Sequence, residues 1–160
     1  MALIIEDGSI VAGSNSYVTD AEFTAYATAR LISYPDTAVL REPLIIKAMD
    51  YLESKVYAGV RTTPSDQELS WPRQNVTAND RLVASDEIPR EMKNAQIEAA
   101  LELDSQELLV NSSVQNIQRE KLDVIEVTYF DSGSNPKLKL EKVNRWLAPF
   151  LADVTQLDRV

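Results

Sequence analysis

The chain has 160 residues, a formal net charge of −9 at pH 7, and neither histidine nor cysteine. This length fits one domain, which can bury roughly two-thirds of its unfolded surface without disulfides or metals. Without these residue types there is no thiol nucleophile, thiolate ligand or imidazole base, so we expect no enzyme, no catalytic residues, no cofactor and no metal site. The acidic charge argues against tight generic binding of nucleic acid, although a local basic patch stays open.

Residues 1–18 combine an apolar start with turn residues such as Asp7-Gly8 and Gly13-Ser14. This pattern is typical of an extended N-terminal arm, either pinned to a neighbour or mobile. No apolar stretch reaches the roughly 20 residues of a membrane span. The start lacks the positive region of a signal peptide. We therefore expect no membrane partner and a cytosolic place of synthesis.

Capping residues and apolar spacing predict two helices in the first part of the chain. Thr19 and Glu22 have the spacing of a capping box, which predicts a helix near 20–31. A second helix is expected over about 42–57, with Pro43 in its first turn. The apolar stripe of this second helix comprises Ile45, Ile46, Met49, Leu52 and Val56.

Residues 59–87 predict a long polar loop, and a loop of this length is usually functional or partly disordered. It contains the segment Leu69-Ser70-Trp71-Pro72-Arg73. Trp71 either anchors the loop to the core or contacts a partner, because Trp and Arg are enriched at binding hot spots. We take Trp71, Pro72 and Arg73 as candidate partner contacts.

The second half predicts a helix from Pro89 to about 109, with acidic residues before its positive end. Alternating residues predict a strand over 124–130, and 115–122 is either its partner strand or a linker.

A last helix is expected over about 137–151, loosened in its final turn by Pro149, before a flexible tail at 152–160. The fold class is therefore mainly α in a single domain. It is a small bundle of about four helices, with a short strand or hairpin near 115–130 and the N-terminal arm.

Aromatic and basic residues give further candidates. Seven aromatic side chains could stack on nucleic-acid bases, but they fall mostly on apolar faces, so we interpret them as core: Tyr26, Tyr51, Tyr57, Trp71, Tyr129, Phe130 and Trp146. The densest groups of basic residues flank the predicted strand: Arg119, Lys121, Lys137, Lys139 and Lys142. They either keep the protein soluble or bind an acidic partner, which could be a second copy of this chain. We retain Lys121, Tyr129 and Trp146 as candidate assembly contacts.

Several short motifs span about residues 3–130. They are Leu3-Ile4-Ile5-Glu6-Asp7-Gly8, Ser16-Tyr17-Val18, Ala48-Met49-Asp50-Tyr51-Leu52, the Leu69–Arg73 segment, Ile88-Pro89 with Lys93 and Ala95, and Glu120-Lys121-Leu122 ahead of Val127-Thr128-Tyr129. In this order they resemble a family of small proteins from tailed-phage genomes. Its members are often labelled DnaT-like single-stranded-DNA-binding proteins, and they also look like head–tail adaptors (connector or head-completion proteins).

The adaptor resemblance implies a virion structural protein that forms a ring of about twelve copies in the phage neck. Its partners would be itself, the portal protein, and a tail or second adaptor (stopper) protein, and it would occupy the host cytoplasm during assembly. DNA would pass through the lumen without specific binding. The alternative is a replication accessory protein that binds single-stranded DNA. Because such binders interleave basic and aromatic residues and this chain is acidic, the sequence alone favours the adaptor.

Overall fold

The computed structural model describes residues 2–105, 119–122, 125–128 and 140–152. The chain forms two compact units, one of residues 1–106 with 140–160 and one of residues 107–139. The described part of the larger unit holds four α-helices and two small antiparallel sheets, and the smaller unit holds a hairpin. The mainly helical fold class predicted from the sequence is confirmed.

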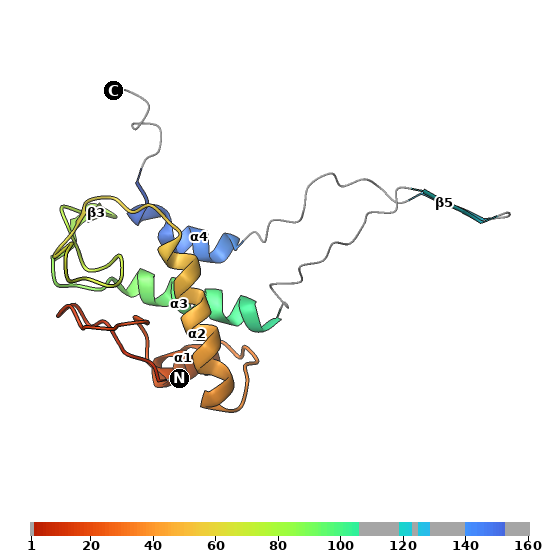
Figure 1. Cartoon of the computed structure of the whole chain (residues 1–160), viewed down its shortest axis with the longest axis horizontal. Helices are drawn as coiled ribbons and strands as arrows, with labels where there is room; N and C mark the ends of the chain where they lie inside the picture. The colour runs from red at the N-terminus through yellow and green to blue at the C-terminus, as the bar shows by residue number, and fades with distance from the viewer. Residues whose placement is uncertain (1, 106–118, 123–124, 129–139, 153–160) are drawn as a thin grey trace, which may run out of the picture. The chain divides into compact units, whose positions relative to one another are not determined.

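Helix α3 (Arg90–Ser105) is the centre of the larger unit and packs against both α2 (Ala38–Glu53) and α4 (Glu141–Leu147). Helix α1 (Asp20–Ala29) packs against α2. Figure 1 shows α2 and α3 crossing one another in this unit. Small buried residues of α3 allow the close approach of its neighbours: Ala95, Ala99 and Ala100. Among the described helices, none is both long and apolar enough to span a membrane.

The start of α1 has the predicted capping box, in which Thr19 and Glu22 satisfy each other's backbone N–H groups. The helix ends at Ala29, earlier than expected from its spacing. Leu31 adopts a left-handed conformation with φ of 55°. The chain then turns, and the Ile32 N–H donates to the carbonyl of Ala27 at 3.0 Å.

Helix α2 begins at Ala38 and ends at Glu53, so the predicted bounds of about 42–57 are wrong at both ends. Pro43 lies inside the helix and not in its first turn. Because proline has no N–H, the carbonyl of Val39, four residues earlier, loses its helical donor. Val56, placed in the apolar stripe by the sequence, lies beyond the helix and is 61% exposed.

Residues 59–87 contain two short hairpins instead of the uniform loop that we expected. Strand β1 (Val60–Arg61) pairs with β2 (Arg73–Gln74), and β3 (Thr77–Ala78) pairs with β4 (Arg81–Leu82), both antiparallel. Strands of two residues are too short for an alternating pattern to be read from the sequence. The Trp71–Pro72 peptide bond in this segment is cis.

The N-terminal segment folds back on its own chain. The carboxylate of Glu6 is fully buried within it. Gly8 has a φ of 107°, and a Cβ there would lie 1.8 Å from the Asp86 carbonyl oxygen, so the Glu6-Asp7-Gly8 motif permits this close approach. The Glu6 oxygens accept the N–H groups of Gly8, Ile10 and Val11 at 2.8, 3.0 and 2.9 Å.

In the smaller unit, β5 (Arg119–Leu122) and β6 (Ile125–Thr128) form an antiparallel hairpin, with Arg119 opposite Thr128 and Leu122 opposite Ile125. Of the two interpretations of 115–122, the partner strand is therefore confirmed for the described residues.

In the larger unit, α4 gives way to the 3₁₀ turn η1 (Ala148–Phe150), which contains Pro149. The predicted effect of this proline is confirmed. The expected helix start near 137 lies outside the described residues.

Candidate functional site

Trp71 lies in the core with a fully buried side chain. Its ring makes edge-to-face contacts with Tyr57 and Phe150, at centroid distances of 6.2 and 5.5 Å. Each such pair stabilises a fold by about 0.5–1.5 kcal/mol beyond its area burial. The indole N–H has no partner among the described atoms, so packing holds the ring. These contacts match the interpretation of Trp71 as an anchor for its own segment.

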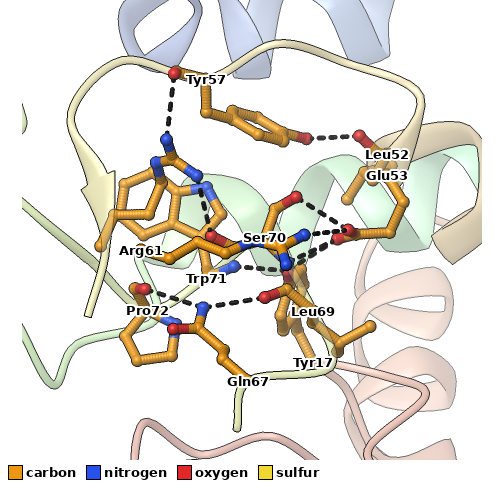
Figure 2. Close-up of polar contacts among 11 residues, drawn as sticks. Tyr17, Leu52, Glu53, Tyr57, Arg61, Gln67, Leu69, Ser70, Trp71 and Pro72 are labelled. Carbon is orange, nitrogen blue, oxygen red and sulfur yellow. Dashed lines mark hydrogen bonds and ion pairs between the residues drawn. The ribbon is translucent and has the colours of Figure 1, made fainter. Parts of the chain in front are cut away.

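A polar network joins this segment to the N-terminal segment and to α2 (Figure 2). The backbone N–H of Trp71 donates to the Tyr17 hydroxyl at 3.1 Å, and that hydroxyl donates to the Glu53 carboxylate at 3.2 Å. The Glu53 carboxylate also accepts the backbone N–H and the hydroxyl of Ser70, at 2.9 and 2.7 Å. Burial, followed by the charge of Glu53, raises the pKa of Tyr17 well above its usual value. Tyr17 therefore stays protonated and remains a donor at neutral pH.

Gln67 holds the loop around Trp71 in shape. Its amide nitrogen donates to the carbonyls of Leu69 and Pro72 at 2.8 and 2.9 Å (Figure 2). Both Gln67 and Pro72 are buried. The side chain thus supplies a donor to the Leu69 carbonyl and a second donor to the Pro72 carbonyl, which also accepts the Thr62 N–H at 3.3 Å.

The guanidinium of Arg73 is hydrogen-bonded to its own chain. An arginine has five N–H donors, and Arg73 directs hydrogen bonds to four backbone carbonyls. Burial lowers the pKa of Arg73, but a guanidinium stays charged. The acceptors are Ala58 at 2.7 Å, Ser70 at 3.2 Å, Tyr57 at 3.2 Å and Gly59 at 2.7 Å. A phosphate or carboxylate from a partner would have to displace these bonds.

The structure brings Trp71, Pro72 and Arg73 into one cluster. Trp146 lies on α4 and is half-buried. Lys121 lies on β5 of the smaller unit, and Tyr129 is outside the described residues. Of the six candidates from the sequence, the described contacts thus bring three into one cluster. The residues that the sequence missed in the cluster are Tyr17, Glu53 and Gln67. Tyr17 and Glu53 carried no local signal because their partners are distant in the chain, whereas the partners of Gln67 lie two and five residues away.

Apart from Arg73, the described basic residues of the larger unit fall into two groups. Four are paired with carboxylates: Arg41 with Asp20 at 2.6 Å, Arg81 with Glu87 at 2.8 Å, Lys93 with Glu22 at 3.0 Å and, more loosely, Arg61 with Glu53 at 3.9 Å. Six others have no carboxylate within 4.0 Å among the described side chains: Arg30, Lys47, Lys55, Arg90, Lys142 and Arg145.

Three aromatic residues that we assigned to the core from the sequence are only half-buried, which corrects that interpretation for Tyr26, Tyr51 and Trp146. Each of the two tyrosines has a cation over its ring. The Arg30 guanidinium carbon lies 3.4 Å from the ring centre of Tyr26, and the Lys55 ammonium lies 4.2 Å from that of Tyr51. Aromatic rings beside free cations are the elements that single-stranded nucleic acid needs.

The two tyrosines differ in the partner of the hydroxyl. Tyr26 donates to the Glu98 carboxylate at 2.7 Å, and burial together with this carboxylate raises the pKa of Tyr26 to about 12. Tyr51 donates to the neutral amide oxygen of Asn144 at 2.9 Å, which joins α2 to α4. Within the described ranges, no three acidic side chains lie close enough to hold a metal ion.

Comparison with families of known proteins matches residues 1–159 to the family described as "Putative DnaT-like ssDNA binding protein". No curated protein and no solved structure matches the chain. The motifs suggested two families, and the match supports the DnaT-like family and not the head–tail adaptors. Because the match covers nearly the whole sequence, the chain belongs to this DnaT-like family.

Proposed function

We propose that this chain is a non-enzymatic protein that binds single-stranded DNA, in the manner of a replication accessory protein. Family membership over residues 1–159 is the observation that carries the proposal. The surface tyrosines and the cations without carboxylate partners support it. Binding of this kind needs only cations for the phosphates and aromatic faces for the bases.

The charge of the chain limits the affinity that this function can have. The net charge of −9 repels a polyanion at long range, and several of the described cations are engaged within the protein. Only a few cations therefore face the phosphates. We expect modest, sequence-independent binding that depends strongly on salt.

A titration of the protein into a labelled single-stranded oligonucleotide, followed by fluorescence anisotropy, tests the proposal. At low salt we expect a Kd tighter than about 10 μM, and an affinity that falls linearly with the logarithm of the salt concentration. A hairpin duplex of matched charge should bind more weakly, because its bases are already stacked. Absence of binding at low salt, or equal affinity for the duplex, would contradict the proposal.

A second candidate is the head–tail adaptor, favoured by the acidic charge and by the hairpin of the smaller unit. Among the described strands, β5 and β6 pair only with each other, so each leaves one edge free for strand addition. In this candidate the chain forms a ring with itself between the portal and a tail or stopper protein. DNA crosses an acidic lumen that does not retain it.

Electron microscopy of purified virions separates the second candidate from the first. A ring of this chain between portal and tail supports the adaptor. Virions whose neck lacks the chain exclude it, and they leave single-stranded DNA binding to be judged by the oligonucleotide titration.

A further inference from the structure

Three residues of α2 and its C-terminal end follow one another at intervals of four: Lys47, Tyr51 and Lys55. Lys47 and Tyr51 lie one turn apart on α2, where side chains at this spacing share one face of the helix. Lys55 lies two residues beyond the helix end at Glu53, and its ammonium is 4.2 Å from the centre of the Tyr51 ring. Tyr51 therefore has one lysine before it on the helix and a second lysine directly over its ring.

The Tyr51 ring faces outward from a helix whose other side is core. Ala48, Met49 and Leu52 are buried against the rest of the unit, whereas Tyr51 is only half-buried. The hydrogen bond from its hydroxyl to Asn144 holds the ring in one orientation. A ring fixed before binding loses little conformational entropy when a base stacks on it.

Helix α4 adds a further cation beside this contact. Arg145 follows Asn144 directly, is exposed, and has no carboxylate within 4.0 Å among the described residues. Two exposed acidic residues, Asp50 and Glu141, belong to the same helices. The surface is therefore mixed in charge, and the Lys55 ammonium is the charge that lies over the tyrosine ring.

Tyr26, which also has a cation over its ring, is less suited to a polyanion. The Tyr26 hydroxyl contacts the carboxylate of Glu98, and Glu22 lies one turn earlier on the same helix. A phosphate brought to Arg30 would approach both negative charges. The aromatic residues around Trp71 are unsuitable for a different reason, since Trp71 has no exposed face.

We propose that the surface formed by Lys47, Tyr51 and Lys55 with Asn144 and Arg145, here called the Tyr51 surface, is the site where this protein binds single-stranded DNA. This inference rests on the proposed function. A base stacks on Tyr51, the Lys55 ammonium moves from the ring to a neighbouring phosphate, and Lys47 contacts a phosphate on the other side. Asn144 positions the ring through its hydroxyl.

Substitutions in the full chain, measured with the labelled oligonucleotide over a range of salt, test this site. Tyr51→Ala should weaken binding by about tenfold, because it removes one stacking partner. Tyr51→Phe keeps the ring and should stay within about threefold of the wild type, the loss of one positioning hydrogen bond. Lys47→Ala with Lys55→Ala should reduce the slope of log affinity against log salt by about 1.4, since each phosphate contact on a single strand contributes about 0.7.

Arg30→Ala is the matched control, because it removes an exposed cation that also lies over a tyrosine ring. Its affinity and salt slope should equal those of the wild type. Thermal unfolding checks that every variant is folded. If the wild type binds and the Tyr51 and lysine variants bind equally well, the Tyr51 surface is not the site and the proposed function stands. If the wild type does not bind, both proposals fall.

Discussion

The regions around Trp71 and around Tyr51 contain the same kinds of groups, namely aromatic rings, cations and hydrogen bonds between distant segments, but use them differently. Near Trp71, Arg73 donates to four backbone carbonyls and the rings pack edge to face in the core. Near Tyr51, the lysines have no carboxylate partner among the described residues, and the ring is half-exposed. The Trp-Pro-Arg segment has the composition of a binding hot spot, yet here its side chains contact residues of the same chain.

Trp71→Ala should have the largest effect on folding. The substitution empties a fully buried site, and changes of this kind lower the free energy of unfolding by about 3–5 kcal/mol. Chemical denaturation measures the loss. Trp146→Ala, at a half-buried tryptophan of the same chain, should cost less. If Trp71→Ala unfolds at the wild-type midpoint, the buried cluster does not stabilise the fold.

Arg73→Met should lower the free energy of unfolding by about 2 kcal/mol or more. The methionine keeps much of the apolar stem but leaves half-buried carbonyls without donors, and each such loss costs about 1–3 kcal/mol. Arg145→Met is the control at an exposed arginine and should stay within about 0.5 kcal/mol. Equal stability of both variants would show that the carbonyl contacts of Arg73 contribute nothing.

The stability of the region around Trp71 should fall at alkaline pH. Burial raises the pKa of both Tyr17 and Tyr57, so above about pH 10 the native state holds protons that the unfolded state has lost. The stability is complete below the unfolded pKa and declines as pH rises beyond it, by up to about 1.4 kcal/mol per pH unit for each group. Denaturation between pH 9 and 11 should show a shallower decline in Tyr17→Phe; an identical decline would contradict the role of Tyr17.

Removing the acidic neighbours of the Tyr51 surface should have the smallest effect. Asp50→Asn with Glu141→Gln removes two exposed negative charges from α2 and α4, and the affinity for single-stranded DNA should rise by about two- to fivefold. The gain should disappear in high salt. Asp66→Asn is an exposed control on the loop before Trp71 and should leave the affinity unchanged. A gain of the same size in that control would indicate an effect of net charge alone.

Local sequence patterns predicted the helices but not the role of each helix surface. Short-range chemistry decides three features that the sequence predicted correctly. They are the capping box at Thr19, the start of α3 after Pro89 and the effect of Pro149. The early start of α2 was missed because proline is typical of the first turn of a helix, whereas Pro43 lies inside this one.

The candidate site depended on contacts that no local pattern encodes. Tyr17 and Glu53 reach Trp71 and Ser70 from distant segments, and these partners decide that the segment is buried. Tyr51 was assigned to the core because the aromatic residues fall mostly on apolar faces of the predicted elements. The sequence shows Lys47 and Lys55 four residues on either side of Tyr51. This spacing indicates a binding surface only together with the structural finding that neither lysine has a carboxylate partner among the described residues.

Photochemical cross-linking to a single-stranded oligonucleotide, with the adduct mapped by mass spectrometry, compares the two regions most directly. Trypsin cuts after Lys47 and Lys55, so the peptide of residues 48–55 isolates Tyr51 from every other aromatic residue. We predict that this peptide carries the main adduct and that the peptide with Trp71 carries none above background. An adduct on Trp71, or adducts confined to peptides outside α2 and α4, would contradict the assignment of a structural role to one region and a binding role to the other.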